Sequence, residues 1–161
     1  MIQTATILLQ HGITPVAIGN NKQALYAWGQ LQNELTSVDA LPDMFGRASA
    51  IATINRRISG GLMVLDFEGQ SHGVDCLFEP WLESLQSESK SLTDKLIYHT
   101  TGGGGYHVRF RCPSDVRSSQ ELAKSKDGKV LIELRGKGGY TLCPPSPGYK
   151  WVVGNWDALP T

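Results

Sequence analysis

Residues 60–69 constrain the fold most, because they form an apolar run that ends in two acids. The run reads GGLMVLDFEG, and its length and its Met, Val, Leu and Phe content are typical of a buried strand. Side chains alternate along a strand, so Asp66 and Glu68 project from one face while Leu65 and Phe67 project from the other. Two carboxylates held this close repel each other unless a cation neutralises them, and the pattern therefore favours a divalent metal. Two solvated acids at a strand end are the alternative.

Composition favours one domain that spans residues 1–161, because a chain of this length with 40% hydrophobic residues can bury one good core. No apolar run approaches the roughly 18 residues of a membrane span, and the N-terminus lacks a signal-peptide pattern. We therefore expect no membrane association and a cytoplasmic location.

The net charge is zero, unlike that of a strong non-specific DNA binder. The three cysteines are not spaced as zinc ligands and are odd in number, so neither a zinc site nor a disulfide framework is expected.

The first half of the chain is predicted to mix helices and strands. Apolar residues at helical spacing predict a helix at residues 2–11, another at about 37–46, and the longest one beginning near residue 77. Short strands are predicted at residues 14–18 and 48–54.

The second half is predicted to be mostly sheet, because from Lys95 onward the apolar period changes from about 3.6 to 2. The polar, Ser-rich residues 86–93 before this change are predicted to be a loop. Residues 113–127 are predicted to be a connection that could contain a short helix. Candidate strands are residues 95–100, 105–111, 128–135, 139–143 and 149–153.

A second candidate site is the segment TTGGGGYHVRFR at residues 100–111. Its four glycines allow tight turns and close approach of the backbone to a ligand. In the strand that follows, His107, Arg109 and Arg111 share one face, and these side chains suit the oxygens of a triphosphate. A Gly-rich hairpin with an arginine-bearing edge strand would look the same without any function. No Gly-Lys-Ser/Thr follows the glycines, which excludes a Walker-type loop.

The third candidate is the strand VLIELR at residues 130–135, in which Glu133 and Arg135 share one face. If this strand lies beside the central one, Glu133 joins Asp66 and Glu68. Three carboxylates around one point could hold two divalent cations about 3.5–4 Å apart, the arrangement that supports phosphoryl or nucleotidyl transfer.

In this order, the three motifs resemble the bifunctional primase–polymerase (prim-pol) family of the archaeo-eukaryotic primase superfamily. The resemblance rests on LDFE at residues 65–68, TTGG with GYH at 100–107, and IELRG with GY and PPS at 132–146. It spans nearly the whole chain. It implies an α+β fold, with an N-terminal α/β unit packed on an RRM-like, largely antiparallel sheet unit and the active site in the cleft between them.

The resemblance also implies residue roles. Asp66, Glu68 and Glu133 would bind two catalytic Mg²⁺ or Mn²⁺ ions, and His107 would contact the phosphates of the incoming nucleotide. Gly105 stands next to the histidine motif, where the family often has a small hydroxyl residue, and Glu68 replaces a commoner Asp. The residues predicted to bind the nucleotide are His107, Gly105, Arg109 and Arg135.

The predicted function is template-dependent nucleotidyl transfer by a DNA primase and DNA polymerase, with single-stranded DNA and (d)NTPs as partners. We expect a monomer that is the N-terminal part of a longer viral or plasmid replication protein, fused to or working with a helicase or accessory helical domain. Two alternatives stay open. One is a metal-dependent nuclease or phosphodiesterase that uses the same carboxylates. The other is a module that binds nucleotide or nucleic acid without catalysis.

Overall fold

The fold combines four α-helices with two antiparallel sheets in the part of the chain that the computed structural model describes, residues 1–55, 57–69, 76–114 and 118–160. The helices are α1 (Ile2–Gln10), α2 (Leu41–Phe45), α3 (Phe78–Glu88) and α4 (Lys90–Thr93), with 3₁₀ turns η1 (Gln30–Gln32), η2 (Val38–Ala40), η3 (Arg57–Ser59) and η5 (Trp156–Ala158). The strands are β1 (Pro15–Ile18), β2 (Ala50–Asn55), β3 (Leu62–Phe67), β4 (Ile97–Thr100), β5 (Tyr106–Arg111), β6 (Gln120–Lys124), β7 (Val130–Arg135), β8 (Gly139–Cys143) and β9 (Trp151–Val153). The predicted α+β class is confirmed.

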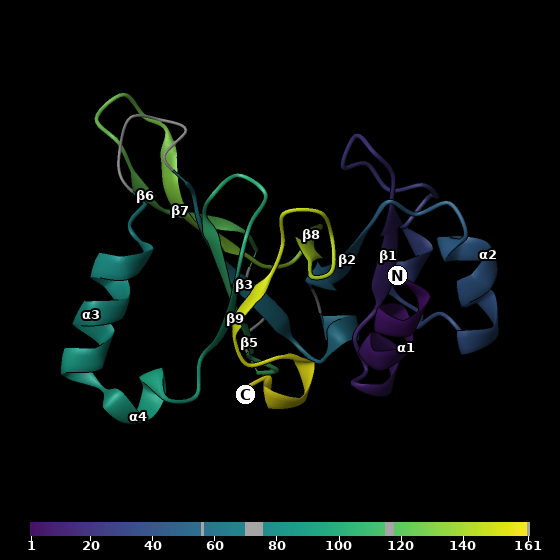
Figure 1. Ribbon diagram of the computed structural model, residues 1–161, viewed down its shortest axis with the longest axis horizontal. Coiled ribbons are helices and arrows are strands. Elements are labelled where there is room, and N and C mark those ends of the chain that lie inside the picture. Colours follow the sequence, from purple (N-terminus) through teal and green to yellow (C-terminus); the bar gives the residue numbers. More distant parts are fainter. Residues whose placement is uncertain (56, 70–75, 115–117, 161) are drawn as a thin grey trace.

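The strands form a small sheet in the order β1-β2-β8 and a large sheet in the order β6-β7-β3-β5-β4-β9. All pairs of named strands run antiparallel. Figure 1 shows α3 and α4 at one end of the molecule, followed by the large sheet, the small sheet, and α1 with α2 at the other end. Because β8 follows β7 in the chain but pairs with β2, the second half of the chain crosses from the large sheet to the small one.

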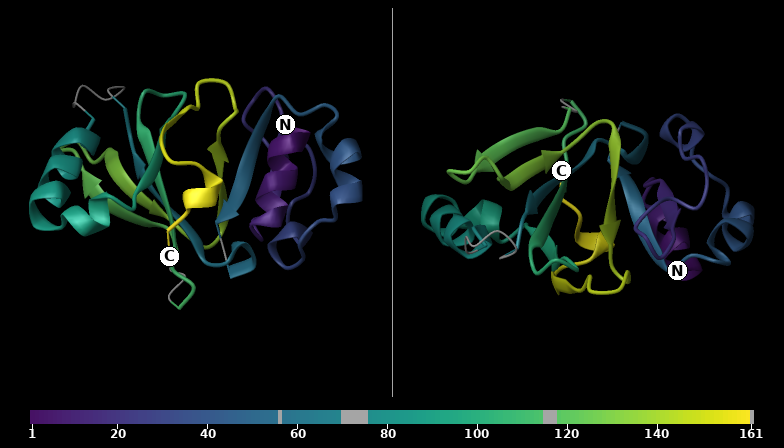
Figure 2. Two further views of the ribbon diagram at one scale, coloured as in Figure 1. Left: turned by 60° about the horizontal axis from the view of Figure 1, so that its bottom comes forward. Right: turned by 90° about the horizontal axis from the view of Figure 1, so that it is seen from above.

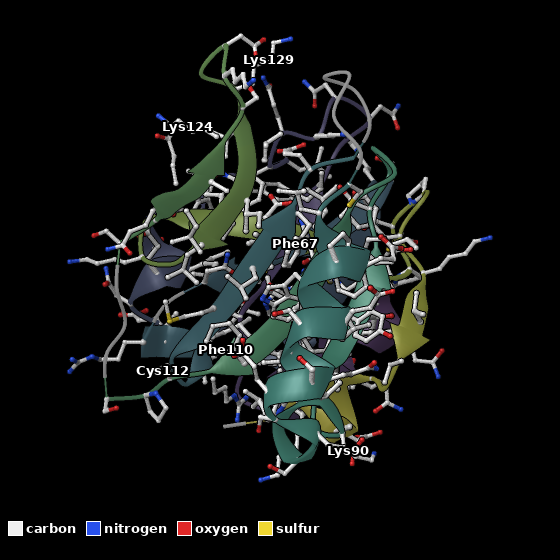
Figure 3. The ribbon with its side chains drawn as sticks, turned by 90° about the vertical axis from the view of Figure 1, so that its left-hand side faces the viewer. Phe67, Lys90, Phe110, Cys112, Lys124 and Lys129 are labelled. Atoms are coloured by element: carbon white, nitrogen blue, oxygen red, sulfur yellow. The ribbon has the colours of Figure 1, made fainter. Side chains whose placement is uncertain are left out.

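One face of the large sheet packs on α3 through aromatic side chains. The ring of Phe67 lies 5.4 Å from that of Phe78 and 5.0 Å from that of Trp81, between centroids. Figure 3 shows α3 lying across this face, with Phe67 beside it. Leu65 belongs to the same cluster, so the strand alternation predicted for the central run is present. The opposite face of β3, which carries the acid, is therefore the one that can meet the small sheet.

The second main core lies where α1, α2 and the small sheet meet the beginning of β3. Leu62 enters this core, and so does Trp156 from the C-terminal segment, which lies between the two sheets in Figures 1 and 2. Its buried members are Ala5, Leu8, Ile13, Ala17, Leu41, Phe45, Ile51, Leu62, Cys143 and Trp156. Burial of this apolar surface ties the two sheets together at one end of β3.

Farther along β3, the two sheets are joined by the guanidinium of Arg109, which has no exposed surface. Its Nη1 donates to Thr53 Oγ1 at 2.9 Å and to Thr141 Oγ1 at 3.2 Å, and its Nη2 donates to Leu142 O at 2.6 Å. Its Nε donates to His99 Nε2 at 2.8 Å. Burial lowers the pKa of Arg109 to about 10, so the group remains a cation at neutral pH.

Two sequence predictions about local structure are wrong. Residues 86–93 are not a loop, because α3 continues to Glu88 and α4 follows at Lys90–Thr93. The exposed helix α4 is polar and is stabilised by the Lys90–Asp94 ion pair. Its sequence therefore shows no apolar period of 3.6 residues that could have predicted a helix. The region 113–127 contains strand β6 rather than a helix, and this edge strand is mostly exposed, so it also lacks apolar alternation. The other predicted helices and strands are present within a few residues of their predicted bounds.

Cys76, Cys112 and Cys143 are free thiols. Cys143 is buried on β8, and burial raises its pKa to about 11. This side chain therefore behaves as a small apolar core residue.

The helices of the described residues include none that is long and apolar enough to cross a membrane. The longest of them, α3, has 11 residues, whereas a spanning helix needs about 20.

Arg109→Ala should destabilise the protein by roughly 3–5 kcal/mol, because it leaves a void and several buried partners without their donor. Urea unfolding followed by circular dichroism measures the loss. The matched control is Arg57→Ala at an exposed position, which should change stability by no more than about 0.5 kcal/mol. Equal stability of the two variants would contradict the bridging role of Arg109.

Candidate active site

A single row of side chains across the large sheet brings most of the predicted site residues together. Asp66 on β3 lies directly opposite Glu133 on β7 on one side and His107 on β5 on the other. The row continues to Glu121 on β6 and to His99 on β4. Residues directly opposite each other in a sheet share a face, so the five side chains form one acid–histidine row. Three acids thus stand beside two histidines.

Arg135, two residues after Glu133, lies across the two central acids. Its Nε is 3.2 Å from Asp66 Oδ2 and also 3.2 Å from Glu133 Oε2. These two carboxylate oxygens are therefore no more than twice that distance apart. The Arg135 side chain is 41% exposed, so its outer part reaches solvent while its Nε serves both acids.

The environment shifts the pKa values of the two acids in opposite directions. Burial raises the pKa of Asp66, but the hydrogen bond and charge of His107 and the charge of Arg135 outweigh it, so the net pKa is lowered. The pKa of Glu133 is raised, first by burial and then by the charges of Asp66 and other nearby acids, against the opposing effect of Arg135. Asp66 therefore stays ionised to a lower pH than an ordinary aspartate, whereas the neighbouring Glu133 takes up a proton more easily than an ordinary glutamate.

His107 is held by Asp66 and has one free ring nitrogen. Its Nε2 lies 3.2 Å from Asp66 Oδ1. Its Nδ1 is buried and has no hydrogen-bond partner among the described residues. Burial lowers the pKa of His107 more than the neighbouring Asp66 raises it, so the imidazole is neutral at pH 7. An unpaired buried nitrogen carries a desolvation penalty that a ligand atom can relieve.

His99 belongs to the row, although the sequence analysis did not select it. Arg109 Nε can only donate, so His99 Nε2 must accept, and His99 Nδ1 therefore carries the proton and donates to Thr100 O at 3.0 Å. Burial and the charge of Arg109 lower the pKa of His99 well below its ordinary value. A hairpin centred on the Gly-rich turn would have paired the two histidines, and that symmetry is the signal that could have identified His99.

Glu68 lies one residue beyond β3, and its backbone N–H donates to Leu131 O at 3.0 Å. Its side chain is partly buried, and its charge contributes to the raised pKa of Glu133. The third predicted carboxylate is thus within electrostatic reach of the pair, although no hydrogen bond or ion pair joins it to another described residue.

The three carboxylates do not form a ready-made metal cage. Across residues 1–55, 57–69, 76–114 and 118–160, no three His, Cys, Asp or Glu side chains converge closely enough to hold a metal ion. The guanidinium of Arg135 lies between two of the acids, with its Nε 3.2 Å from an oxygen of each. The donor set nevertheless suits Mg²⁺ or Mn²⁺, because carboxylate oxygens are their preferred ligands and a cation already lies between Asp66 and Glu133.

The Gly-rich turn before β5 presses against the backbone that follows Asp66. A Cβ on Gly105 would lie 2.0 Å from Phe67 O, so the position accepts no side chain. The backbone N–H of Gly105 donates to Thr101 Oγ1, and its carbonyl accepts from Thr101 N–H. Gly105 was predicted to bind the nucleotide, and in this structure its backbone N–H and carbonyl are used within the turn while its Cα packs closely against Phe67.

The two arginines predicted to contact the nucleotide differ in placement. Arg109 shares the face of the row but lies in the interior with its donors occupied, which argues against direct contact with a nucleotide. Arg135 is accessible and lies at the acids. Of the two, only Arg135 is placed to reach a phosphate.

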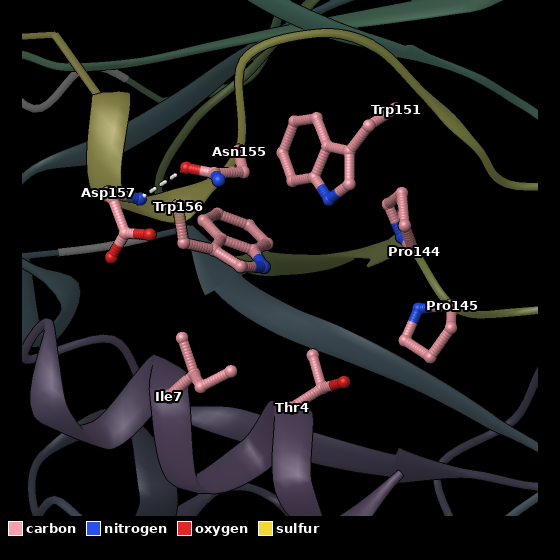
Figure 4. Close-up of a pocket in the computed structure, with 8 residues that line it drawn as sticks. All are labelled: Thr4, Ile7, Pro144, Pro145, Trp151, Asn155, Trp156 and Asp157. Atoms are coloured by element: carbon pink, nitrogen blue, oxygen red, sulfur yellow. Dashed lines mark hydrogen bonds between the residues drawn. The ribbon is translucent and has the colours of Figure 1, made fainter.

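A pocket of about 270 Å³ lies outside the acid–histidine row (Figure 4). None of the predicted site residues lines it. Trp151 lines the pocket and also contacts the row, because its ring packs edge-on against His99 with 5.1 Å between centroids. Its lining residues are Thr4, Ile7, Pro144, Pro145, Trp151, Asn155, Trp156 and Asp157.

The fold and the row define a class of protein: an α+β chain whose antiparallel sheet presents adjacent carboxylates, a basic residue between them and a histidine. The family described as bifunctional DNA primase/polymerase, N-terminal, matches residues 7–161, essentially the whole chain. The protein belongs to this family, and the resemblance expected from the motifs is confirmed. Membership supports nucleotidyl transfer of the primase/polymerase type. A comparison with curated proteins gives no match.

Gly105→Ala should destabilise the protein by about 2–3 kcal/mol, because the new methyl group forces Phe67 and the turn apart. Gly103→Ala is the matched control in the same turn, since a Cβ there would meet only Thr101 Oγ1 at 4.0 Å. It should change the unfolding free energy by no more than about 0.5 kcal/mol. Urea unfolding compares the two variants, and similar losses would show that close packing does not explain Gly105.

Stability should fall as the pH is lowered below about 6.5, because the unfolded chain then protonates His99 and His107 while the folded protein resists. Each histidine contributes a slope of about 1.4 kcal/mol per pH unit until its lowered folded pKa is reached. Unfolding free energies measured between pH 8 and pH 5 test this. His99→Gln should remove one of the two contributions, and an unchanged slope in that variant would contradict the neutral, Arg109-bonded state of His99.

Proposed function

We propose that this protein is a template-dependent nucleotidyltransferase, a DNA primase and polymerase, and that Asp66, Glu68 and Glu133 hold two Mg²⁺ or Mn²⁺ ions. The observation that supports this most directly is the pairing of Asp66 with Glu133 across neighbouring strands with a cation between them. Two adjacent acids on rigid strands form a binding site that demands positive charge. Such bound ions would activate the attacking 3′-hydroxyl and neutralise the pyrophosphate that leaves.

The protein's own residues would prepare the site for this chemistry. Asp66 stays ionised because its pKa is lowered, so it is available as a ligand over the physiological pH range. His107 orients Asp66 through the contact at Oδ1 and leaves Oδ2 to Arg135 and to an incoming cation. The Gly-rich turn fixes the backbone next to these side chains by direct contact with Phe67.

His107 would bind a phosphate oxygen of the incoming nucleotide through Nδ1. This nitrogen is buried, unpaired and on the far side of the ring from the bond to Asp66. A neighbouring triphosphate raises the pKa of the imidazole, which then gains a proton on Nδ1 and donates it in a charge-assisted hydrogen bond. Arg135 reaches solvent and would meet the same phosphates.

The β6–β7 hairpin offers cationic side chains for the backbone of a single-stranded DNA template. Lys124 and Lys129 stand at this hairpin and project into solvent in Figure 3. One of the two strands of this hairpin, β7, carries Glu133. Template contact here would be electrostatic and would weaken with salt.

The larger setting is also part of the proposal. A monomeric domain of this kind would act as the N-terminal part of a longer viral or plasmid replication protein, together with a helicase or an accessory helical domain.

Asp66→Asn should lower nucleotide incorporation by about a thousandfold or more, because it removes the ionised ligand at the centre of the row. Primer extension and de novo synthesis on single-stranded templates, with Mg²⁺ or Mn²⁺ and either nucleotide set, measure the loss. Asp94→Asn makes the same change at an exposed acid on the surface and should retain full activity. Thermal unfolding checks that both variants are folded.

Pyrophosphate release distinguishes polymerisation from the open alternatives. A nuclease would shorten the template without releasing pyrophosphate, and a non-catalytic module would bind nucleotide without turnover. Either outcome for the wild-type protein, or retained synthesis in Asp66→Asn, would overturn the proposed function.

A further inference from the structure

Arg135 occupies the place where a divalent ion would join Asp66 and Glu133. Its Nε is 3.2 Å from one oxygen of each acid. An Mg²⁺ ion binds carboxylate oxygens at about 2.0–2.1 Å, so an ion that bridged these two oxygens would lie in the space between them that Nε now fills. The guanidinium nitrogen and the ion cannot occupy this position at once.

The acids need a cation there even when no metal is bound. Asp66 and Glu133 are direct cross-strand partners, a position in which two like charges destabilise a sheet. Their side chains are only 12% and 19% exposed, so water screens the repulsion poorly. Arg135 is on the same strand as Glu133 and supplies the missing positive charge.

Arg135 can leave this position, whereas Arg109 cannot. Arg109 has no exposed surface and is fixed by hydrogen bonds to both sheets. The Arg135 side chain is 41% exposed, and its terminal amino groups make no hydrogen bond to another described residue. A change of side-chain rotamer would therefore release it into solvent without breaking a hydrogen bond or ion pair to any other described residue.

We propose that Arg135 is a placeholder for the divalent cation: in the metal-free protein its guanidinium holds Asp66 and Glu133 together, and metal binding displaces it. This inference rests on the proposed function, because it assumes that the metal binds at these acids. It gives Arg135 a role before the nucleotide arrives, and once displaced its guanidinium is free to meet the phosphates.

Calorimetric titration of Mn²⁺ into metal-free protein tests the proposal without any measurement of activity. Arg135→Met should bind Mn²⁺ about tenfold more tightly than the wild type, because the metal no longer competes with a guanidinium for the same oxygens. Lys137→Met removes the same charge from an exposed position on the same chain segment and should bind Mn²⁺ like the wild type. Unchanged or weaker binding by Arg135→Met would overturn the placeholder role.

A measurement on the wild-type protein covers the case in which Arg135→Met does not fold. The Nε–H signal of Arg135 in a ¹⁵N NMR spectrum, assigned by its loss in Arg135→Lys, should shift or broaden when Mg²⁺ saturates the protein. A signal that does not respond to saturating Mg²⁺ would show that the guanidinium stays in place and would overturn the proposal.

Asp66→Asn separates this inference from the proposed function. If the wild type binds Mn²⁺ and Asp66→Asn does not, the metal site stands, and the Arg135 result alone decides the placeholder role. If the wild type has no binding that depends on Asp66, the metal site itself is wrong, and the proposed function fails together with the inference.

Discussion

The repulsion between Asp66 and Glu133 is the constraint on which the rest of the site depends. Register places the two acids directly opposite each other on neighbouring strands of the large sheet, where their side chains are only 12% and 19% exposed. Their neighbours are arranged to offset this repulsion, with His107 on one side of Asp66 and Arg135 across both acids. A sheet built in this way is unfavourable without cations, and that is a useful property for a protein whose family acts on nucleotides.

Arg109 and Arg135 lie on the same face of the large sheet but have different roles because their surroundings differ. Arg109 lies where the sheets approach each other, and its hydrogen bonds to Thr53, Thr141 and Leu142 make it part of the interior. Arg135 lies nearer the acids and remains open to solvent. One cation holds the two sheets at a fixed separation, and the other can respond to a ligand. Residue type alone does not distinguish these roles.

The sequence predicted the acids better than it predicted their partners. The alternation in the run that ends at Asp66, and the same pattern around Glu133, made both acids visible because a strand with one covered face keeps an apolar period of 2. His99 was missed because its partner His107 is known only once the hairpin is aligned. Strand β6 was missed because an exposed edge strand needs no apolar residues. Neither the pairing of residues across strands nor an exposed strand leaves a trace in the local apolar pattern.

The sequence by itself determined the α+β class, most of the element positions, and the set of acids, glycines and basic residues that identifies the family. Only the tertiary structure decided which of these residues meet. It placed Asp66 between Glu133 and His107, put Arg109 in the interior, and brought Gly105 so close to Phe67 O that no side chain fits there. The physical reason is that local periodicity fixes the face on which a side chain lies, whereas register and packing between distant strands fix its neighbours, burial and charge.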